Sequence, residues 1–349
     1  MRKLARAALW IVGALVLVIC VATAMLIYPG RPADGHNLRF AGYIDLPKVK
    51  NSGALSLLDY LTVAGDDLFV TNVSTGAVYK VGLHKRSLPD TADVSVFELE
   101  PAAHGVVVDP TSHVAFVTHS AANTVDVFDP KTMRLVKRIP VANDPDGIFY
   151  DPFDKLVYAA SSDSMVATLI DPTSQTSIGV IKLGGTPEFA AFDLGTKLLY
   201  QNLSDANSVV AVDLAKRSVV RRWPLNGCEM PTGMAIDEAD RRLFIACGKS
   251  SKLLIFDLDL HRVVASVPVG FGPDSVAYDP ELHRIYVTGL VGKLTVVSQD
   301  GKDAYRVADS INLHFNAHTL AIDPATHGLY VGYASLAIPP RLAVFTPSR

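Results

Sequence analysis

Six polar residues recur along the chain at nearly constant spacing, each just before a short apolar run. Successive members are 42 or 44 residues apart: His104, Asp146, Glu188, Thr232, Asp274 and His318. Imidazoles and carboxylates are donors that hold a divalent ion, and a histidine beside a carboxylate also suits general acid–base chemistry. The pattern therefore predicts a ligand-binding set, with His104, His318 and Glu188 as candidate metal ligands and a divalent metal ion as the candidate cofactor.

A structural explanation of the same residues stays open. Loop carboxylates also cap the ends of strands, in which case these six residues are solvated loop positions. If they do form a site, His119, Asn202 and His314 would extend the same surface. The catalytic residues stay unknown, because the sequence has no G-x-S-x-G, H-E-x-x-H or G-x-x-x-x-G-K-[ST] motif.

A repeat of short strands must position these residues. An aspartate ends six apolar runs at the same 42- or 44-residue spacing, and a second aspartate follows four of them after 20 residues. The two sets are Asp109, Asp151, Asp193, Asp237, Asp279 and Asp323, and Asp129, Asp171, Asp213 and Asp257. A strand repeat of this period is typical of a β-propeller with one four-stranded blade per repeat. Many of these aspartates precede proline, which favours turns, so they are expected to be structural and not catalytic.

The two ends of the chain predict how the ring closes. The last repeat has only three strands, ending near Leu342–Phe345, and Leu38–Leu46 is an extra strand ahead of the first full repeat. Because a closed ring has no exposed edge, the N-terminal strand is expected to complete the last blade. We therefore predict an all-β fold, a seven-bladed β-propeller of four-stranded antiparallel blades over residues 29–349. The six polar residues then surround the mouth of the central funnel, with an apolar sector at Ser56-Leu57-Leu58 in the first blade.

The first 28 residues have the pattern of a targeting segment. Arg2, Lys3 and Arg6 precede 22 uncharged residues, Ala7 to Tyr28, enough to span a bilayer. The basic flank should stay cytoplasmic, which sends the rest of the chain across the membrane. Residues 22–24 offer a small-x-small cleavage site, so 1–28 is expected to be a signal peptide or an N-terminal membrane anchor. The protein is then periplasmic or extracellular, and anchored in the inner membrane by residues 7–28 if the segment is uncleaved.

Several stretches resemble the bacterial YVTN-repeat, YncE-like propellers. They are His104–Pro110, His318–Pro324, and the strand segments Phe116–His119 and Tyr286–Gly289, while residues 185–190 and 228–247 are similar to an exported subgroup. The resemblance covers nearly the whole chain after the N-terminal segment. It implies the propeller architecture and an extracytoplasmic compartment. It implies no activity, because members of the family have no agreed one.

The cysteines permit one cross-link. In a propeller, Cys228 falls in a loop between blades and Cys247 ends the second strand of the next blade, both toward the funnel. Outside the cytoplasm such a pair is oxidised, so we predict a Cys228–Cys247 disulfide. Two separate buried thiols are the alternative.

Composition and motifs leave three function classes. The chain is 49% hydrophobic and 19% charged, which excludes a disordered protein, and its net charge of −3 argues against a nucleic-acid partner. The favoured hypothesis is a binding or scaffolding module of the cell envelope, a monomer with a small-molecule or envelope-protein partner. It would contact the membrane through the N-terminal segment if that segment is uncleaved. A metal-assisted, lactonase-like hydrolase or lyase at the funnel is the alternative. A redox-partner propeller comes third, without a haem or cofactor motif.

Overall fold

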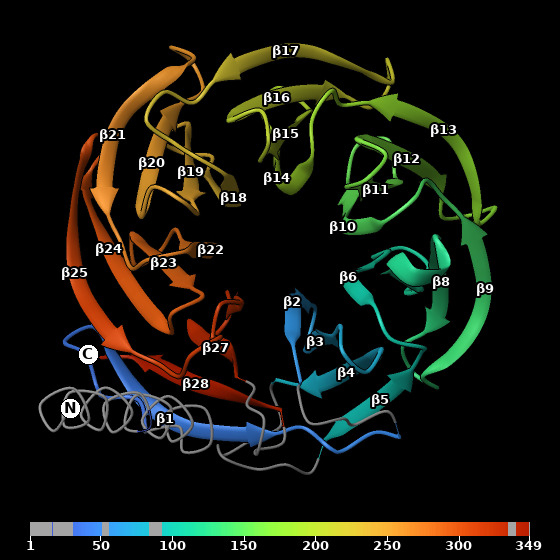
Figure 1. Cartoon of the computed structure of the whole chain (residues 1–349), viewed down its shortest axis with the longest axis horizontal. Coiled ribbons are helices and arrows are strands. Elements are labelled where there is room, and N and C mark those ends of the chain that lie inside the picture. Colours follow the sequence, from blue (N-terminus) through green and yellow to red (C-terminus); the bar gives the residue numbers. More distant parts are fainter. Residues whose placement is uncertain (1–15, 17–30, 51–55, 84–92, 334–339, 349) are drawn as a thin grey trace, which may run out of the picture.

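The predicted seven-bladed propeller is confirmed. The computed structural model describes residues 16, 31–50, 56–83, 93–333 and 340–348, and within them 28 strands form seven antiparallel sheets of four. The sheets stand around one axis as blades (Figure 1). The predicted targeting segment, residues 1–28, lies outside the described residues apart from position 16. In the described part of the chain, no helix has the length and apolar character needed to cross a bilayer.

Each blade is a meander that runs from the axis outward. Blade 1 consists of β2 (Leu58–Ala64), β3 (Asp67–Asn72), β4 (Ala77–Gly82) and β5 (Val94–Glu98). Blade 2 consists of β6 (Ala103–Val108), β7 (Ala115–His119), β8 (Thr124–Asp129) and β9 (Arg134–Pro140), with a 3-10 turn, η1 (Ser120–Ala122), after β7. Blade 3 consists of β10 (Pro145–Asp151), β11 (Leu156–Ser161), β12 (Val166–Asp171) and β13 (Thr176–Lys182).

The remaining blades follow the same order. Blade 4 consists of β14 (Pro187–Asp193), β15 (Leu198–Leu203), β16 (Ser208–Asp213) and β17 (Ser218–Pro224). Blade 5 consists of β18 (Pro231–Asp237), β19 (Arg242–Cys247), β20 (Lys252–Asp257) and β21 (Arg262–Pro268). Blade 6 consists of β22 (Pro273–Asp279), β23 (Arg284–Gly289), β24 (Lys293–Gly301) and β25 (Ala304–Asn312). Blade 7 consists of β26 (Leu320–Asp323), β27 (Gly328–Tyr333), β28 (Arg341–Pro347) and, outermost, β1 (Leu38–Asp45).

The core lies between neighbouring blades, which explains the apolar runs. Successive residues of a strand face opposite sides of its sheet. On β7, Phe116 packs into the cluster shared with blade 3, whereas Val117 packs into the cluster shared with blade 1. A middle strand such as β7 is therefore buried at every position, including Thr118 and His119, while an outermost strand such as β9 is largely exposed.

The N-terminal strand closes the ring as predicted. β1 pairs antiparallel with β28, from Leu38 opposite Pro347 to Asp45 opposite Arg341. The carboxylate of Asp309 on β25 accepts hydrogen bonds from the backbone amides of His36 and Asn37 at 2.8 and 2.7 Å, and so fixes the start of this strand to blade 6. The two ends of the described chain consequently meet at blade 7 (Figure 1).

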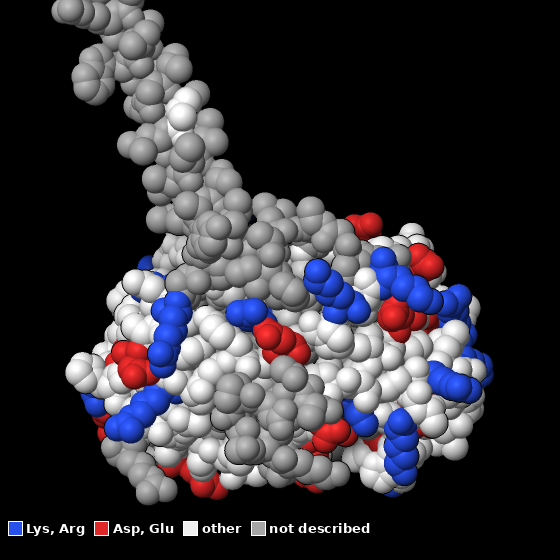
Figure 2. Space-filling view, turned by 90° about the horizontal axis from the view of Figure 1, so that it is seen from below, with Lys and Arg blue, Asp and Glu red and all other residues white. Residues whose placement is uncertain are grey.

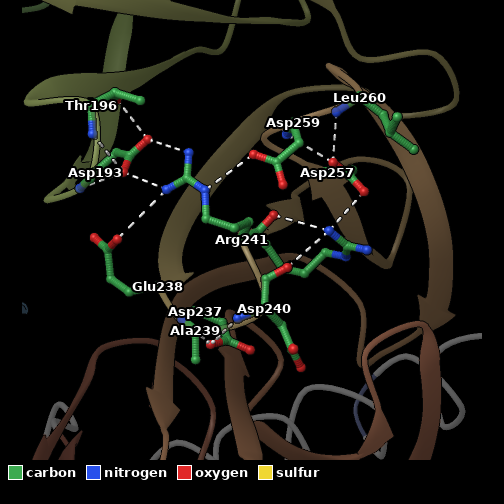
Figure 3. A network of polar contacts seen from close by, with 12 residues as sticks. Asp193, Thr196, Asp237, Glu238, Ala239, Asp240, Arg241, Asp257, Asp259 and Leu260 are labelled. Atoms are coloured by element: carbon green, nitrogen blue, oxygen red, sulfur yellow. Dashed lines mark hydrogen bonds and ion pairs between the residues drawn. The ribbon is translucent and has the colours of Figure 1, made fainter.

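The repeating aspartates are structural, as expected. Asp109 Oδ1, for example, accepts a hydrogen bond from the amide of Thr111 at 2.9 Å and so holds the turn between β6 and β7. Arg241 joins two such turns, with Nη2 2.8 Å from Asp193 Oδ2 of blade 4 and Nε 3.2 Å from Asp259 Oδ1 of blade 5 (Figure 3). In these turns the aspartate side chains are thus bound within the protein, to backbone amides and to Arg241.

Charges of both signs are mixed on the side of the ring. The view that faces β1 has Lys, Arg, Asp and Glu side chains interspersed with uncharged surface (Figure 2). This agrees with the small net charge of the chain.

Candidate functional site

The six predicted polar residues occupy one equivalent position in six blades. Each lies two residues before the paired apolar run of its innermost strand, at the end where the chain enters the blade from the preceding loop. In β2, β6, β10, β14, β18 and β22 the register with the second strand shifts at or directly after this position. Such a bulge turns a side chain away from its sheet, here toward the axis. We call these positions, with the seventh described next, the funnel ring.

Blade 1 supplies a seventh member, which corrects the sequence analysis. Leu58 pairs with Asn72 as Ala103 pairs with His119, so Asp59 is the equivalent of His104. The predicted apolar sector at Ser56-Leu57-Leu58 is wrong, because Leu58 is buried in the core between blades 1 and 7 and the ring position belongs to Asp59. The funnel ring is therefore Asp59, His104, Asp146, Glu188, Thr232, Asp274 and His318.

His104 lies between two carboxylates. Its Nδ1 is 2.7 Å from Asp59 Oδ2 and 3.3 Å from Asp146 Oδ1, and its Nε2 is 3.1 Å from Ser120 Oγ. The three side chains are 20 to 25% exposed, so they are shielded yet reachable from solvent. One donor atom from each lies within 4.8 Å of the other two, a separation at which all three can ligate a single metal ion.

Several carboxyl groups of the funnel ring are buried close together, and this raises their pKa values into the range around neutral pH. Burial, and then the charge of Asp59, raises the pKa of Asp146 to about 7. Burial, and then the charge of Asp146, raises the pKa of Glu188 to about 8. Burial also raises the pKa of Asp274 to about 6, although His318 works against it. A cation that enters the ring would relieve this repulsion and displace the protons.

The two neighbouring carboxylates raise the pKa of His104. Burial works to lower it, but the hydrogen bond with Asp59 and the negative charges of Asp146 and Asp59 outweigh burial. The pKa of His104 therefore lies above its ordinary value. The imidazole and its two carboxylates bind either a proton or another cation.

An aromatic pair, which the sequence analysis missed, bridges the axis beneath the ring. Tyr60 of β2 stacks on Phe189 of β14, with ring centroids 4.9 Å apart. Gly147 of β10 admits the Tyr60 hydroxyl, since a Cβ there would lie 3.3 Å from it and 3.1 Å from the Phe149 ring. Burial, and then the charges of Asp146, Asp59, Glu188 and Asp274, raises the pKa of Tyr60 well above its ordinary value. We call the acidic residues of the funnel ring together with this aromatic pair the cup.

The other predicted residues serve the framework. The Thr232 hydroxyl is buried and donates a hydrogen bond to the carbonyl of Pro273 at 2.9 Å, which ties blade 5 to blade 6. His318 Nε2 is 3.8 Å from Asp274 Oδ2. His119, Asn202 and His314 do not extend the surface as expected, because all three are buried, the first two on second strands and His314 in the loop before β26. Among the described residues, the cluster with metal-ligand spacing contains His104 but neither His318 nor Glu188, so joint ligation by those three stays a prediction.

The predicted disulfide is present. Cys228 and Cys247 are bonded with their Cα atoms 5.2 Å apart, and both are almost fully buried. Pro231, next to the ring residue Thr232, pairs with Cys247. The cross-link therefore fixes the loop that leads into β18 to the end of β19, at the funnel end of blade 5.

Comparison with known proteins supports the fold. No protein-family model matches the sequence, and a search of curated proteins finds no match either. The chain is similar to a chain in a solved structure of Kuenenia stuttgartiensis hydrazine synthase, with a TM-score of 0.70 and 18% identity over 83% of this chain and 96% of that one. It is also similar to a chain in a crystal structure of the mitotic checkpoint complex, with a TM-score of 0.71 and 15% identity over 90% of this chain and 93% of that one. At such low identity, these likenesses show the propeller fold alone.

Proposed function

We propose that this protein is an extracytoplasmic binding propeller whose cup holds a divalent metal ion on Asp59, His104 and Asp146. The observation that carries the proposal is the position of His104 Nδ1, 2.7 and 3.3 Å from oxygens of two carboxylates. These three donors come from blades 1, 2 and 3, so the ring itself assembles them.

Ser120 supports this assignment through the other ring nitrogen. When Nε2–H donates to Ser120 Oγ, the unprotonated Nδ1 turns its lone pair toward Asp59 and Asp146. In that tautomer the lone pair is repelled by the two carboxylates unless a proton or another cation lies between them. Metal-binding histidines commonly have such a partner on the second nitrogen, which sets the tautomer.

The donor set favours a first-row transition metal over calcium or magnesium. Imidazole is a ligand for zinc, copper, iron or nickel, and carboxylates also suit manganese, whereas calcium and magnesium prefer oxygen ligands throughout. Three protein ligands leave coordination positions open toward the cup. A small molecule or a side chain of an envelope protein would then complete the coordination.

The compartment and family remain part of the proposal. A buried disulfide is typical of an oxidising compartment, and the basic-then-apolar N-terminal sequence agrees with export. The repeat motifs support assignment to the exported YncE-like propellers. The protein is proposed to act there as a monomer.

The alternative is a metal-assisted hydrolase or lyase of the lactonase class. Asp146 and Glu188 favour it, because their pKa values of about 7 and about 8 suit proton transfer at neutral pH. In that case the ion would polarise a substrate carbonyl and Glu188 would exchange the proton. A panel of lactones, assayed with and without a chelator, tests this alternative.

Direct titration tests the metal site. Full-length protein in mild detergent, stripped with a chelator, should bind one equivalent of Zn²⁺ or Mn²⁺ by calorimetry. Asp59→Asn, His104→Gln and Asp146→Asn should each weaken binding by at least about tenfold, and Ser120→Ala should weaken it less.

The matched control is Asp163→Asn, an exposed carboxylate at the turn between β11 and β12 on the same face. It should bind like the wild type. Failure of the stripped wild-type protein to bind either ion, or equal binding by the His104 variant, would refute the site.

A further inference from the structure

A patch of exposed apolar side chains lies on the funnel face of blade 6. Phe271 is 63% exposed, Phe315 is 53% exposed, and Leu290 and Val291 are 43 and 45% exposed. A cluster of exposed apolar side chains on a protein surface commonly marks a site where a partner or ligand binds. We call these four residues the apolar rim.

Backbone hydrogen bonds hold the three segments of the rim side by side. The amide of Leu290, in the turn between β23 and β24, donates to the carbonyl of Gly272 at 3.0 Å. The amide of Asn316, in the loop before β26, donates to the carbonyl of Leu290 at 2.9 Å. The rim is therefore one built surface, not three unrelated loops.

The rim adjoins the half of the cup that the proposed metal site does not use. Phe271 precedes the ring residue Asp274 by three positions, and Phe315 precedes His318 by three. Asp274 Oδ2 and His318 Nε2 are themselves 3.8 Å apart, so two of the rim segments lead into neighbouring members of the acidic ring. Glu188 in blade 4 adds a further carboxyl group to the cup.

We propose that the apolar rim and the Asp274–Glu188 side of the cup together dock an extended segment of a partner protein. That segment presents two or more apolar side chains to the rim and one lysine or arginine to the cup. Charge complementarity selects this occupant, because a basic side chain meets carboxylates that are otherwise crowded by like charge. An anionic membrane surface would be repelled by the same carboxylates.

Peptide selection tests the proposal without knowledge of the natural partner. Full-length protein in mild detergent, kept in a chelator so that the metal site plays no part, is panned against a display library of random peptides. Selected peptides should share apolar residues beside a lysine or arginine. A synthetic peptide of that consensus should lose at least about tenfold in affinity by fluorescence anisotropy when its basic residue becomes glutamine.

Variants then locate the binding surface. Phe271→Ser with Phe315→Ser, and separately Asp274→Asn, should each weaken the peptide by about tenfold or more. The control is Leu260→Ser, a 58% exposed leucine in the turn between β20 and β21 at the opposite face, which should bind normally. Circular dichroism melts confirm that each variant is folded.

Any of the following results would overturn the proposal. The first is selection without enrichment of basic residues, or equal binding by the rim variants. The second is rim-dependent binding to vesicles of phosphatidylcholine and phosphatidylglycerol, which would make the rim a lipid surface. The third is a dimer, detected by light scattering, that the rim variants dissociate. Because the experiment is performed in chelator, loss of metal binding and loss of peptide binding are distinguished.

Discussion

Tyr60 and Phe189 stack at 4.9 Å although their blades, 1 and 4, are not neighbours in the ring. Tyr60 directly follows the ring residue Asp59, and Phe189 directly follows the ring residue Glu188. The two bulged strands therefore turn a carboxyl group into the cup and an aromatic ring across the axis at successive positions. The aromatic pair is thus formed by the residues that directly follow two acidic members of the ring.

The aromatic pair should contribute to stability. Tyr60→Ala leaves a cavity beside Phe189 and should lower the free energy of unfolding by about 3 kcal/mol, the cost typical of a buried aromatic truncated to alanine. Tyr60→Phe keeps the stack and should cost less than about 1.5 kcal/mol. Urea denaturation measures both. An equal cost for the two variants would show that the hydroxyl, and not the stacked ring, is what matters.

The disulfide should add a modest amount to a fold that does not depend on it. Cys228 and Cys247 are 19 residues apart, for which the chain-entropy model gives about 3 kcal/mol. Cys228→Ser with Cys247→Ser should therefore still fold, with a lower denaturation midpoint. Peptide mapping without reductant should find the cross-linked pair in the wild type. Labelling of both thiols in exported protein would contradict the pairing.

Removal of the closing strand should have a larger effect than removal of the disulfide. Without β1, the edge of β28 is unpaired, and an unpaired edge is a template for association. Deletion of residues 29–46 should therefore produce aggregation or a large loss of stability. Asp309→Ala, which removes only the contact with His36 and Asn37, is the graded control and should cost less. A deletion variant that melts like the wild type would disprove the closure.

The sequence predicts the architecture because each repeat contains several local patterns that mark its strands and turns. Turn aspartates, apolar runs and their offsets are sufficient to count blades and to place six of the ring residues. Asp59 has the same two-residue offset from Leu61 that His104 has from Val106. It was missed because the run in blade 1 ends at Ala64-Gly65, without the aspartate that marks the other repeats.

Other features depend on contacts that periodicity does not encode. The stack of Tyr60 on Phe189 joins blades across the axis, whereas a repeat pattern predicts only neighbours in the chain and in the ring. Similarly, the burial of His119 and Asn202 follows from their position on second strands, which are covered on both faces. A polar residue near the funnel in sequence is for this reason not always on its surface.

The pH dependence of the free energy of unfolding should reveal the protonation of Asp146, Glu188 and His104 in the cup. A carboxyl whose pKa is higher in the folded than in the unfolded chain binds more protons when folded, so the free energy of unfolding falls as the pH rises between the two values. For Asp146 this window runs from 3.8 to about 7, and for Glu188 from 4.5 to about 8. His104, whose pKa is also raised, changes stability in the same direction.

Metal-free protein should therefore be more stable at pH 5 than at pH 8, as measured by urea denaturation at both values. Asp146→Asn and Glu188→Gln should each flatten this slope, whereas Asp163→Asn should leave it unchanged. Zn²⁺ must displace protons from the cup, so the stabilisation that it provides should grow as the pH rises over the same range. A wild-type slope that matches the slopes of the Asp146 and Glu188 variants would show that the cup carboxyls do not hold protons near neutral pH.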